Sequence, residues 1–136
     1  MPFVLDASLA LTACFRDEAT PEADQVLEQL NDDEAHVPAI WPLELLNALL
    51  VARRSGRVRP EGFPELVEVV RSLPVSVEPM ATERVFTSVL SFAQAHQLTS
   101  YDASYLELAF RLGVPLATKD ARLRRAAGRL GLSVLP

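Results

Sequence analysis

The chain has 136 residues, of which 49% are hydrophobic, and it carries a formal net charge of −5 at pH 7. This composition excludes a disordered chain, and no apolar run reaches the roughly 20 residues of a membrane-spanning helix. The length fits one domain covering residues 1–136 with no signal peptide, and Cys14 as the single cysteine excludes an internal disulfide, so we expect a cytoplasmic protein that does not bind membranes.

Short apolar runs alternate with amphipathic stretches along the chain. Proline at the first helical turn and glycine just after the last turn mark several helix ends. In chain order the sequence predicts a strand ending at Asp6, a helix over 8–15 capped by Ser8, a helix over 21–32, a strand over 35–40, helices over 41–56 and 60–73, a strand over 75–79, helices over 81–98 and 102–113, a strand over 114–118, a helix over 120–131 and a strand over 132–136.

This alternation predicts the fold class. Strands separated by helices, with no hairpin turn signals, are typical of a parallel sheet covered by helices on both faces. We therefore expect an α/β fold with three layers, α/β/α, and a short central parallel sheet.

Four acidic side chains fall at strand ends or helix starts. Asp6 ends the first strand, Asp120 follows the strand over 114–118, and Asp102 and Glu44 begin helices. In an open parallel sheet, ligands bind outside the carboxyl ends of the strands, so these acids can meet there. Oxygen ligands without histidine or cysteine favour Mg²⁺ or Mn²⁺. Taken singly, each acid is equally explained as a helix cap or a first-turn acid that suits the helix dipole.

The charge is unevenly distributed. Eight acidic and no basic residues lie between Asp17 and Glu34, whereas nine of the thirteen Lys and Arg residues fall within 53–59 and 119–129. A net acidic protein can still present a basic rim around a site that binds phosphate groups. The alternative is that these residues are solvated helix ends.

Three stretches together carry a family resemblance: FVLDAS at the start, PLELLNAL near the middle, and LTSYDASYLELAFRLGVPLATKDARL near the end. In this order and over essentially the whole chain, they resemble a PIN domain, most closely the VapC-type toxin ribonucleases of toxin–antitoxin pairs. The resemblance implies an endoribonuclease that depends on Mg²⁺ or Mn²⁺. Some relatives carry a further acid after the last aspartate, where ARLRR supplies none, which argues against a second tightly held ion.

The resemblance also implies roles for individual residues. The catalytic acids correspond to Asp6, Glu44, Asp102 and Asp120, of which Asp6, Asp102 and Asp120 would be the metal ligands. Ser8 and Thr118 would orient a carboxylate or a water molecule. We expect the RNA phosphates to be bound chiefly by Arg53, Arg54, Lys119 and Arg122.

The resemblance further implies a VapB-type antitoxin as partner, and we expect a homodimer formed through the helices that carry Phe63, Phe86, Val89 and Leu90. Two other α/β classes fit the sequence less well. A haloacid-type phosphatase needs a second acid where Ser8 stands, and a phospho-receiver needs paired acids after the first strand. A non-catalytic RNA- or protein-binding module on the same fold stays open as the alternative, although the presence of all four acids argues against it.

Overall fold

A computed structural model describes residues 1–136 and contains one five-stranded sheet in the order β3-β2-β1-β4-β5. All four strand pairings are parallel. The strands are β1 (Phe3–Leu5), β2 (Ala35–Pro38), β3 (Val75–Glu78), β4 (Leu116–Ala117) and β5 (Val134–Leu135). The first strand therefore lies in the middle of the sheet, with the second and fourth beside it.

Eight α-helical segments connect the strands: α1 (Ala7–Ala10), α2 (Pro21–Gln29), α3 (Trp41–Arg54), α4 (Phe63–Arg71), α5 (Thr82–Arg84), α6 (Leu90–His96), α7 (Ser100–Leu112) and α8 (Ala121–Arg129). A π-helical turn, Val85–Val89, joins α5 to α6, so the predicted long helix is continuous but wider in its middle. Three short 3₁₀ helices cover Leu11–Ala13, Arg16–Glu18 and Pro60–Gly62. None of the helices has the length and apolarity required to span a bilayer.

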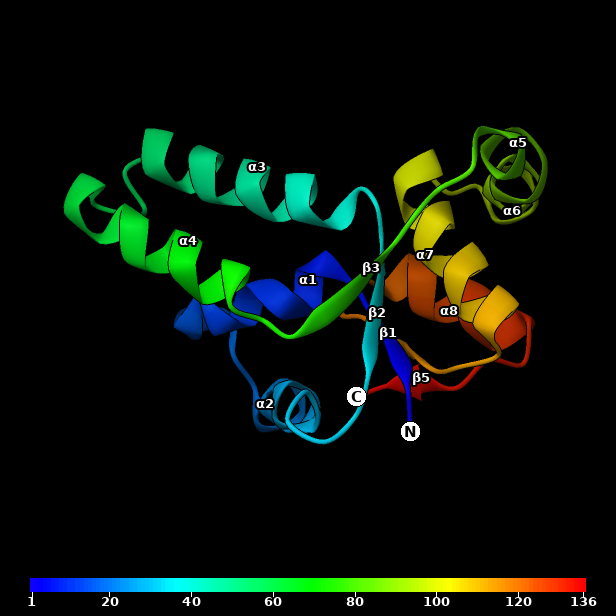
Figure 1. The fold of residues 1–136 in the computed structure, drawn as a ribbon, viewed down its shortest axis with the longest axis horizontal. Helices are drawn as coiled ribbons and strands as arrows, with labels where there is room; N and C mark the ends of the chain where they lie inside the picture. The colour runs from blue at the N-terminus through cyan, green and yellow to red at the C-terminus, as the bar shows by residue number, and fades with distance from the viewer.

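The helices form two outer layers. Figure 1 shows the sheet nearly edge-on, with α1 to α4 on one side and α5 to α8 on the other. The predicted three-layer α/β/α class with a short parallel sheet is therefore confirmed.

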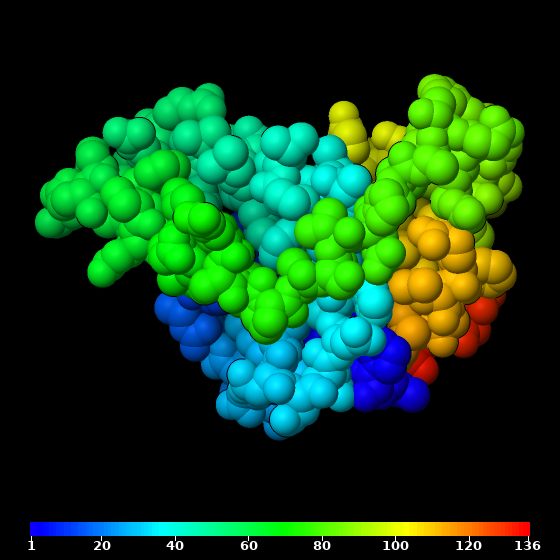
Figure 2. Space-filling model, in the orientation of Figure 1, coloured from blue at the N-terminus to red at the C-terminus, as the bar shows by residue number.

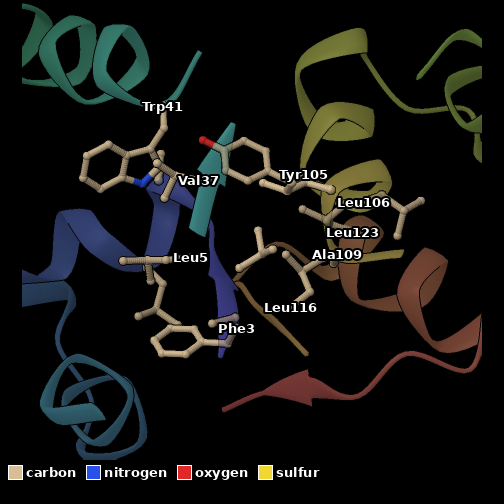
Figure 3. Packing of buried hydrophobic residues seen from close by; sticks show 14 of the residues in the cluster. Phe3, Leu5, Val37, Trp41, Tyr105, Leu106, Ala109, Leu116 and Leu123 are labelled. Atoms are coloured by element: carbon tan, nitrogen blue, oxygen red, sulfur yellow. The ribbon is translucent and has the colours of Figure 1, made fainter. Parts of the chain in front are cut away.

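The core lies on both faces of β1. Phe3, Val4 and Leu5 are at most 1% exposed and belong to a cluster of 25 buried residues. Figure 3 shows this packing, with Trp41 of α3 on one side of β1 and β2 and Tyr105 of α7 on the other. A strand buried on both faces needs a continuous apolar run, which FVL provides. The core thus fixes the carboxyl end of β1, where Asp6 follows.

Two helix starts differ from the sequence prediction. Ser8 was predicted to cap the first helix, but Asp6 occupies the N-cap position and Ser8 lies inside α1. The second difference concerns α7, which begins at Ser100 and not at Asp102. Its cap is Thr99, whose hydroxyl accepts a hydrogen bond from the Asp102 amide at 3.1 Å. Asp102 therefore sits in the first turn, and its carboxylate is not used as a cap.

The apolar residues expected to form a homodimer surface are only partly exposed. Phe86 and Leu90 are 69% and 45% exposed, but Val89 is buried at 2%. Phe63 lies in the other predicted helix and is half-covered, with the Arg53 guanidinium 5.1 Å above its ring. Figure 2 shows the helices from α3 to α4 and from α5 to α6 as two raised ends of the molecule, with a dip between them. The exposed apolar side chains of the expected surface thus lie on the α5–α6 end.

Candidate active site

Asp6 lies at the carboxyl end of the central strand and is only 5% exposed. Its Oδ2 atom accepts two hydrogen bonds of 2.6 Å, one from the hydroxyl of Ser8 and one from the hydroxyl of Thr118. The Asp6 amide donates to the Ala117 carbonyl, so the chain at this point is still paired with β4. The two hydroxyls therefore hold one carboxylate oxygen in a fixed position, from two segments that are far apart in sequence.

The turn after β4 is bonded to the same group. The amide of Asp120 donates to the Thr118 hydroxyl at 3.0 Å, and the amide of Lys119 donates to the Ser8 hydroxyl at 3.3 Å. Asp120 caps α8, because its Oδ1 atom accepts from the Leu123 amide at 2.9 Å. Asp120 is thus a helix cap, as its sequence position suggested, and it also faces Asp6.

Glu44 and Asp102 are contributed by α3 and α7. Glu44 lies in the first turn of α3, where its Oε1 atom accepts a 2.6 Å hydrogen bond from the hydroxyl of Tyr105. Tyr105 is fully buried in α7, one turn after Asp102, and Figure 3 shows its hydroxyl directed toward the α3 side. Tyr105 was not among the predicted site residues. The spacing of three between Asp102 and Tyr105, which places them on one helix face, was the available signal.

The four carboxylates form one electrostatic group. Burial is the main cause that raises the pKa of Asp6, Glu44 and Asp102. The negative charge of Asp120 raises the pKa of Asp6 further, and the charge of Asp6 raises the pKa of both Glu44 and Asp102. None of the four acids forms an ion pair within the chain. The site therefore concentrates negative charge that no ion pair within the chain neutralises.

The donor set fits a hard divalent cation. All the side chains gathered here offer oxygen atoms, which suits Mg²⁺ or Mn²⁺ better than zinc. A cation would offset the cost of burial and the repulsion that now raise the pKa of Asp6, Glu44 and Asp102. No group of three or more acidic, histidine or cysteine side chains converges into a ready-made metal cluster anywhere in the chain. Such a cluster is not required, because Mg²⁺ usually keeps several waters, so that some of the carboxylates can hold the ion through a water molecule.

The predicted RNA-binding residues divide into two pairs. Arg122 lies close enough to Asp102 that its charge opposes the rise in the pKa of that acid, and Lys119 adjoins Asp120 in the chain. Arg53 and Arg54 lie nine and ten residues beyond Glu44 in α3, which is about 14 to 15 Å along the helix axis. The structure thus brings Lys119 and Arg122 to the acids and places the two arginines of α3 at the far end of that helix.

A cavity of about 580 Å³ opens beside the acids. Ser8, Lys119 and Asp120 line it beside the acids, and Ser55 and Arg57 line it at the C-terminal end of α3. Arg57 belongs to the basic segment that the sequence singled out, but it was not among the residues predicted to bind RNA. Arg57 donates hydrogen bonds to the carboxylate of Asp17, 40 residues earlier in the chain, and no pattern in the sequence indicates this contact.

Known proteins match this chain over most of its length. Residues 3–129 match the family model described as PIN domain. The chain is 34% identical over 134 residues to Ribonuclease VapC12 of Mycobacterium tuberculosis, with 92% of each chain covered. It is 26% identical over 123 residues to Ribonuclease VapC3 of Pyrobaculum aerophilum, covering 90% of this chain and 92% of that protein.

Solved structures share the fold. The crystal structure of PAE2754 from Pyrobaculum aerophilum has a TM-score of 0.66 at 26% identity and covers 93% of this chain and 87% of that one. The structure of VapBC2 from Rickettsia felis, bound to a DNA fragment from its promoter, has a TM-score of 0.68 at 12% identity and covers 98% and 97% of the two chains.

Proposed function

The chain belongs to the PIN-domain family and, within it, to the VapC ribonucleases, and from this premise we propose that it is a Mg²⁺-dependent endoribonuclease that hydrolyses RNA phosphodiester bonds. One observation carries the proposal. Four acids from four separate parts of the chain gather at the carboxyl edge of the sheet, where burial and the charges of neighbouring acids raise the pKa of Asp6, Glu44 and Asp102, and none of the four forms an ion pair within the chain.

In this proposal the aspartates hold the ion and Glu44 handles a proton. Asp6, Asp102 and Asp120 would bind Mg²⁺ or Mn²⁺, which supplies Lewis-acid polarisation of the phosphate and lowers the pKa of water. Glu44 would accept the proton of the attacking water, since its raised pKa brings it closer to neutral pH. The Tyr105 hydroxyl orients the Glu44 carboxylate for this step. Water, and not the ribose 2′-hydroxyl, would attack the phosphorus, and the bond from phosphorus to the 3′-oxygen would break. The 3′-oxygen then takes up a proton from solvent, which leaves a 5′-phosphate and a 3′-hydroxyl.

The remaining polar residues position the acids and the substrate. Ser8 and Thr118 fix the Oδ2 atom of Asp6, which leaves its carboxylate in one orientation. Lys119 and Arg122 would contact the phosphates on either side of the cut. Arg53 and Arg54 would contact RNA farther along the strand, where their contribution is a salt-sensitive attraction.

We further propose that the chain is the toxin of a toxin–antitoxin pair. The support is its relationship to proteins named VapC and its structural similarity to a VapBC complex. A VapB-type antitoxin is accordingly the proposed protein partner. The exposed Phe86 and Leu90 support a homodimer as the state of the free chain.

The experiment that tests the activity compares the purified chain, with and without Mg²⁺, on total RNA. We expect cleavage that needs the ion, stops on chelation and leaves 5′-phosphate ends. The Asp102→Asn variant provides the negative control, because Asp102 accepts no cap bond and Thr99 keeps the helix start intact. Binding of RNA without cleavage by the wild-type chain would instead support the non-catalytic module.

A cellular test addresses the toxin role. Expression of the wild-type chain alone should arrest growth, and expression of Asp102→Asn at the same level should not. Equal toxicity of the two chains would contradict a toxin that acts by cleaving RNA.

A further inference from the structure

The cavity beside the acids is continuous with the catalytic site. Ser8 and Asp120, which take part in the hydrogen-bonded group around Asp6, also line the cavity wall. A phosphate held at the acids therefore has one neighbouring nucleoside at the mouth of this cavity. Its volume of about 580 Å³ falls within the range of pockets that bind small molecules.

The walls of the cavity are apolar. Leu11 and Phe15 contribute from the segment after β1, and Ala48 and Ala52 contribute from α3. These two alanines are four residues apart and so lie on one face of the helix, where their small side chains leave the space open. An apolar slot next to a phosphate site suits a nucleobase, whose faces are apolar and whose edges are polar.

A flat side chain, the guanidinium of Arg57, lines the cavity near the C-terminal end of α3. The Arg57 guanidinium lies 4.0 Å from the centre of the Phe15 ring. It also donates hydrogen bonds of 2.7 to 3.0 Å to Asp17 and Glu18, which hold the guanidinium at its edge. A phosphate would have to compete with these two carboxylates for Arg57. Phe15 is only 7% exposed, so its ring supports the guanidinium from behind. A neutral base can stack on the guanidinium of Arg57, whose side chain is 40% exposed, without disturbing these carboxylates.

Polar groups lie at the rim. The Lys119 ammonium donates to the Glu18 carbonyl at 3.2 Å, and both residues line the cavity. Ser55 lies at the end of the α3 wall. These donors and acceptors are placed to meet the edge of a bound base, which is where one base differs from another.

We propose that this cavity binds the nucleobase of the nucleotide next to the scissile phosphate, with the Arg57 guanidinium, supported by Phe15, as its stacking surface and Ala48 as the residue that sets its depth. The inference rests on the proposed nuclease function and makes the cavity a determinant of where RNA is cut. It requires the bound base to leave its stack, so an unpaired nucleotide is the form that fits.

The test compares ligands that differ only in the base. Calorimetry with Mg²⁺ present would measure the binding of the four nucleoside 5′-monophosphates and of ribose 5-phosphate, which has the phosphate and sugar but no base. For the wild-type chain we expect at least one nucleotide to bind about 10-fold more tightly than ribose 5-phosphate, the size expected for stacking of one base. Equal affinity for all five ligands would overturn the proposal.

Two variants and a matched control locate the binding. Ala48→Leu fills the cavity with a residue that favours helix, so the preference for a nucleotide over ribose 5-phosphate should disappear. Arg57→Lys keeps the charge but loses the plane, and it should reduce the preference several-fold. Ala95→Leu makes the same change as the first variant on exposed α6, and it should behave as wild type. An unchanged preference in Ala48→Leu would place the base elsewhere.

The same proteins assayed on total RNA separate this inference from the proposed function. Cleavage by the wild-type chain without any base preference would keep the nuclease and overturn the base site, leaving the cavity to another occupant such as a segment of the antitoxin. A base preference without cleavage would support the site as a nucleotide-binding site and contradict the nuclease.

Discussion

Two buried acidic regions of the molecule differ in how their charge is neutralised. Glu107 in α7 is 2% exposed, and its Oε1 atom receives Arg111 at 2.9 Å and Arg84 at 3.3 Å. Asp6 is 5% exposed, but its partners are two neutral hydroxyls and its charged neighbours are acids. A buried charge is tolerated only when something compensates it. Glu107 is compensated by its own chain, whereas Asp6 is left for an external cation.

The largest expected difference between the two regions is in activity. Asp6→Asn removes the charge with little change in volume, so we expect RNA cleavage to fall by at least about 100-fold, more than the loss of an outer-shell partner of a metal usually costs. Mg²⁺ binding measured by calorimetry should weaken in parallel. The matched control, Glu107→Gln, changes an equally buried acid and should cleave RNA within a few-fold of wild type. Comparable losses in the two variants would mean that burial, and not ligation, explains the effect.

The next difference is in stability, where the two regions should respond with opposite signs. Replacing both Arg84 and Arg111 by Ala leaves the Glu107 charge buried without a partner. The cost of such a loss is typically 3–5 kcal/mol, and because the two arginines are 41% and 30% exposed we expect about 2–3 kcal/mol. Asp6→Asn in metal-free buffer should instead stabilise the fold, by on the order of 1 kcal/mol. Denaturant unfolding of both variants in a chelating buffer would measure the two changes.

The sequence was sufficient to predict the strands and helices that carry these acids, but not the side-chain contacts between them. The apolar run FVL, the proline and glycine punctuation and the alternation of helices with strands predicted the parallel sheet and the edge where Asp6 lies. The helix start at 99–102 was misassigned because Thr99 and Asp102 are both good caps, and the spacing T-x-x-D of a capping box favours the first.

Contacts between distant segments were outside the reach of sequence patterns. The hydrogen bond from Tyr105 to Glu44 spans 61 residues, and the ion pair of Arg57 with Asp17 spans 40. Both depend on how α1, α3 and α7 pack around the sheet, which local periodicity does not specify. Only the structure therefore identified Tyr105 as the partner of Glu44, the proposed proton acceptor, and Arg57 as the stacking surface in the cavity.

A smaller effect on activity is expected at the partner of Glu44. Tyr105→Phe removes the hydroxyl that donates to Glu44 and keeps the packing of the ring, so we expect kcat to fall by roughly 10-fold, less than the roughly 100-fold or more that loss of the proton acceptor itself would cost. The lost hydrogen bond had been lowering the pKa of Glu44, so that pKa should rise further. The acidic limb of the pH–rate profile should move to higher pH, with Mg²⁺ affinity unchanged. A fall in kcat without this movement would reduce Tyr105 to a packing residue.

The smallest effect is the pH dependence of the stability gain in Asp6→Asn. The pKa of Asp6 in the folded chain is raised above its unfolded value, chiefly by burial and further by the charge of Asp120. The folded state therefore binds the proton more tightly, and the ionised carboxylate destabilises the metal-free fold at neutral pH. As the pH falls through the folded pKa, Asp6 becomes protonated and this penalty is lost. The advantage of Asp6→Asn should accordingly be full at neutral pH, shrink on acidification and vanish below the unfolded pKa. Saturating Mg²⁺ should reverse it at neutral pH, because the ion stabilises only the chain that binds it. A gain in stability that is independent of both pH and Mg²⁺ would show that the substitution acts through packing. The charge of Asp6 would then already be compensated within the chain, as that of Glu107 is, and the contrast between the two acids would be wrong.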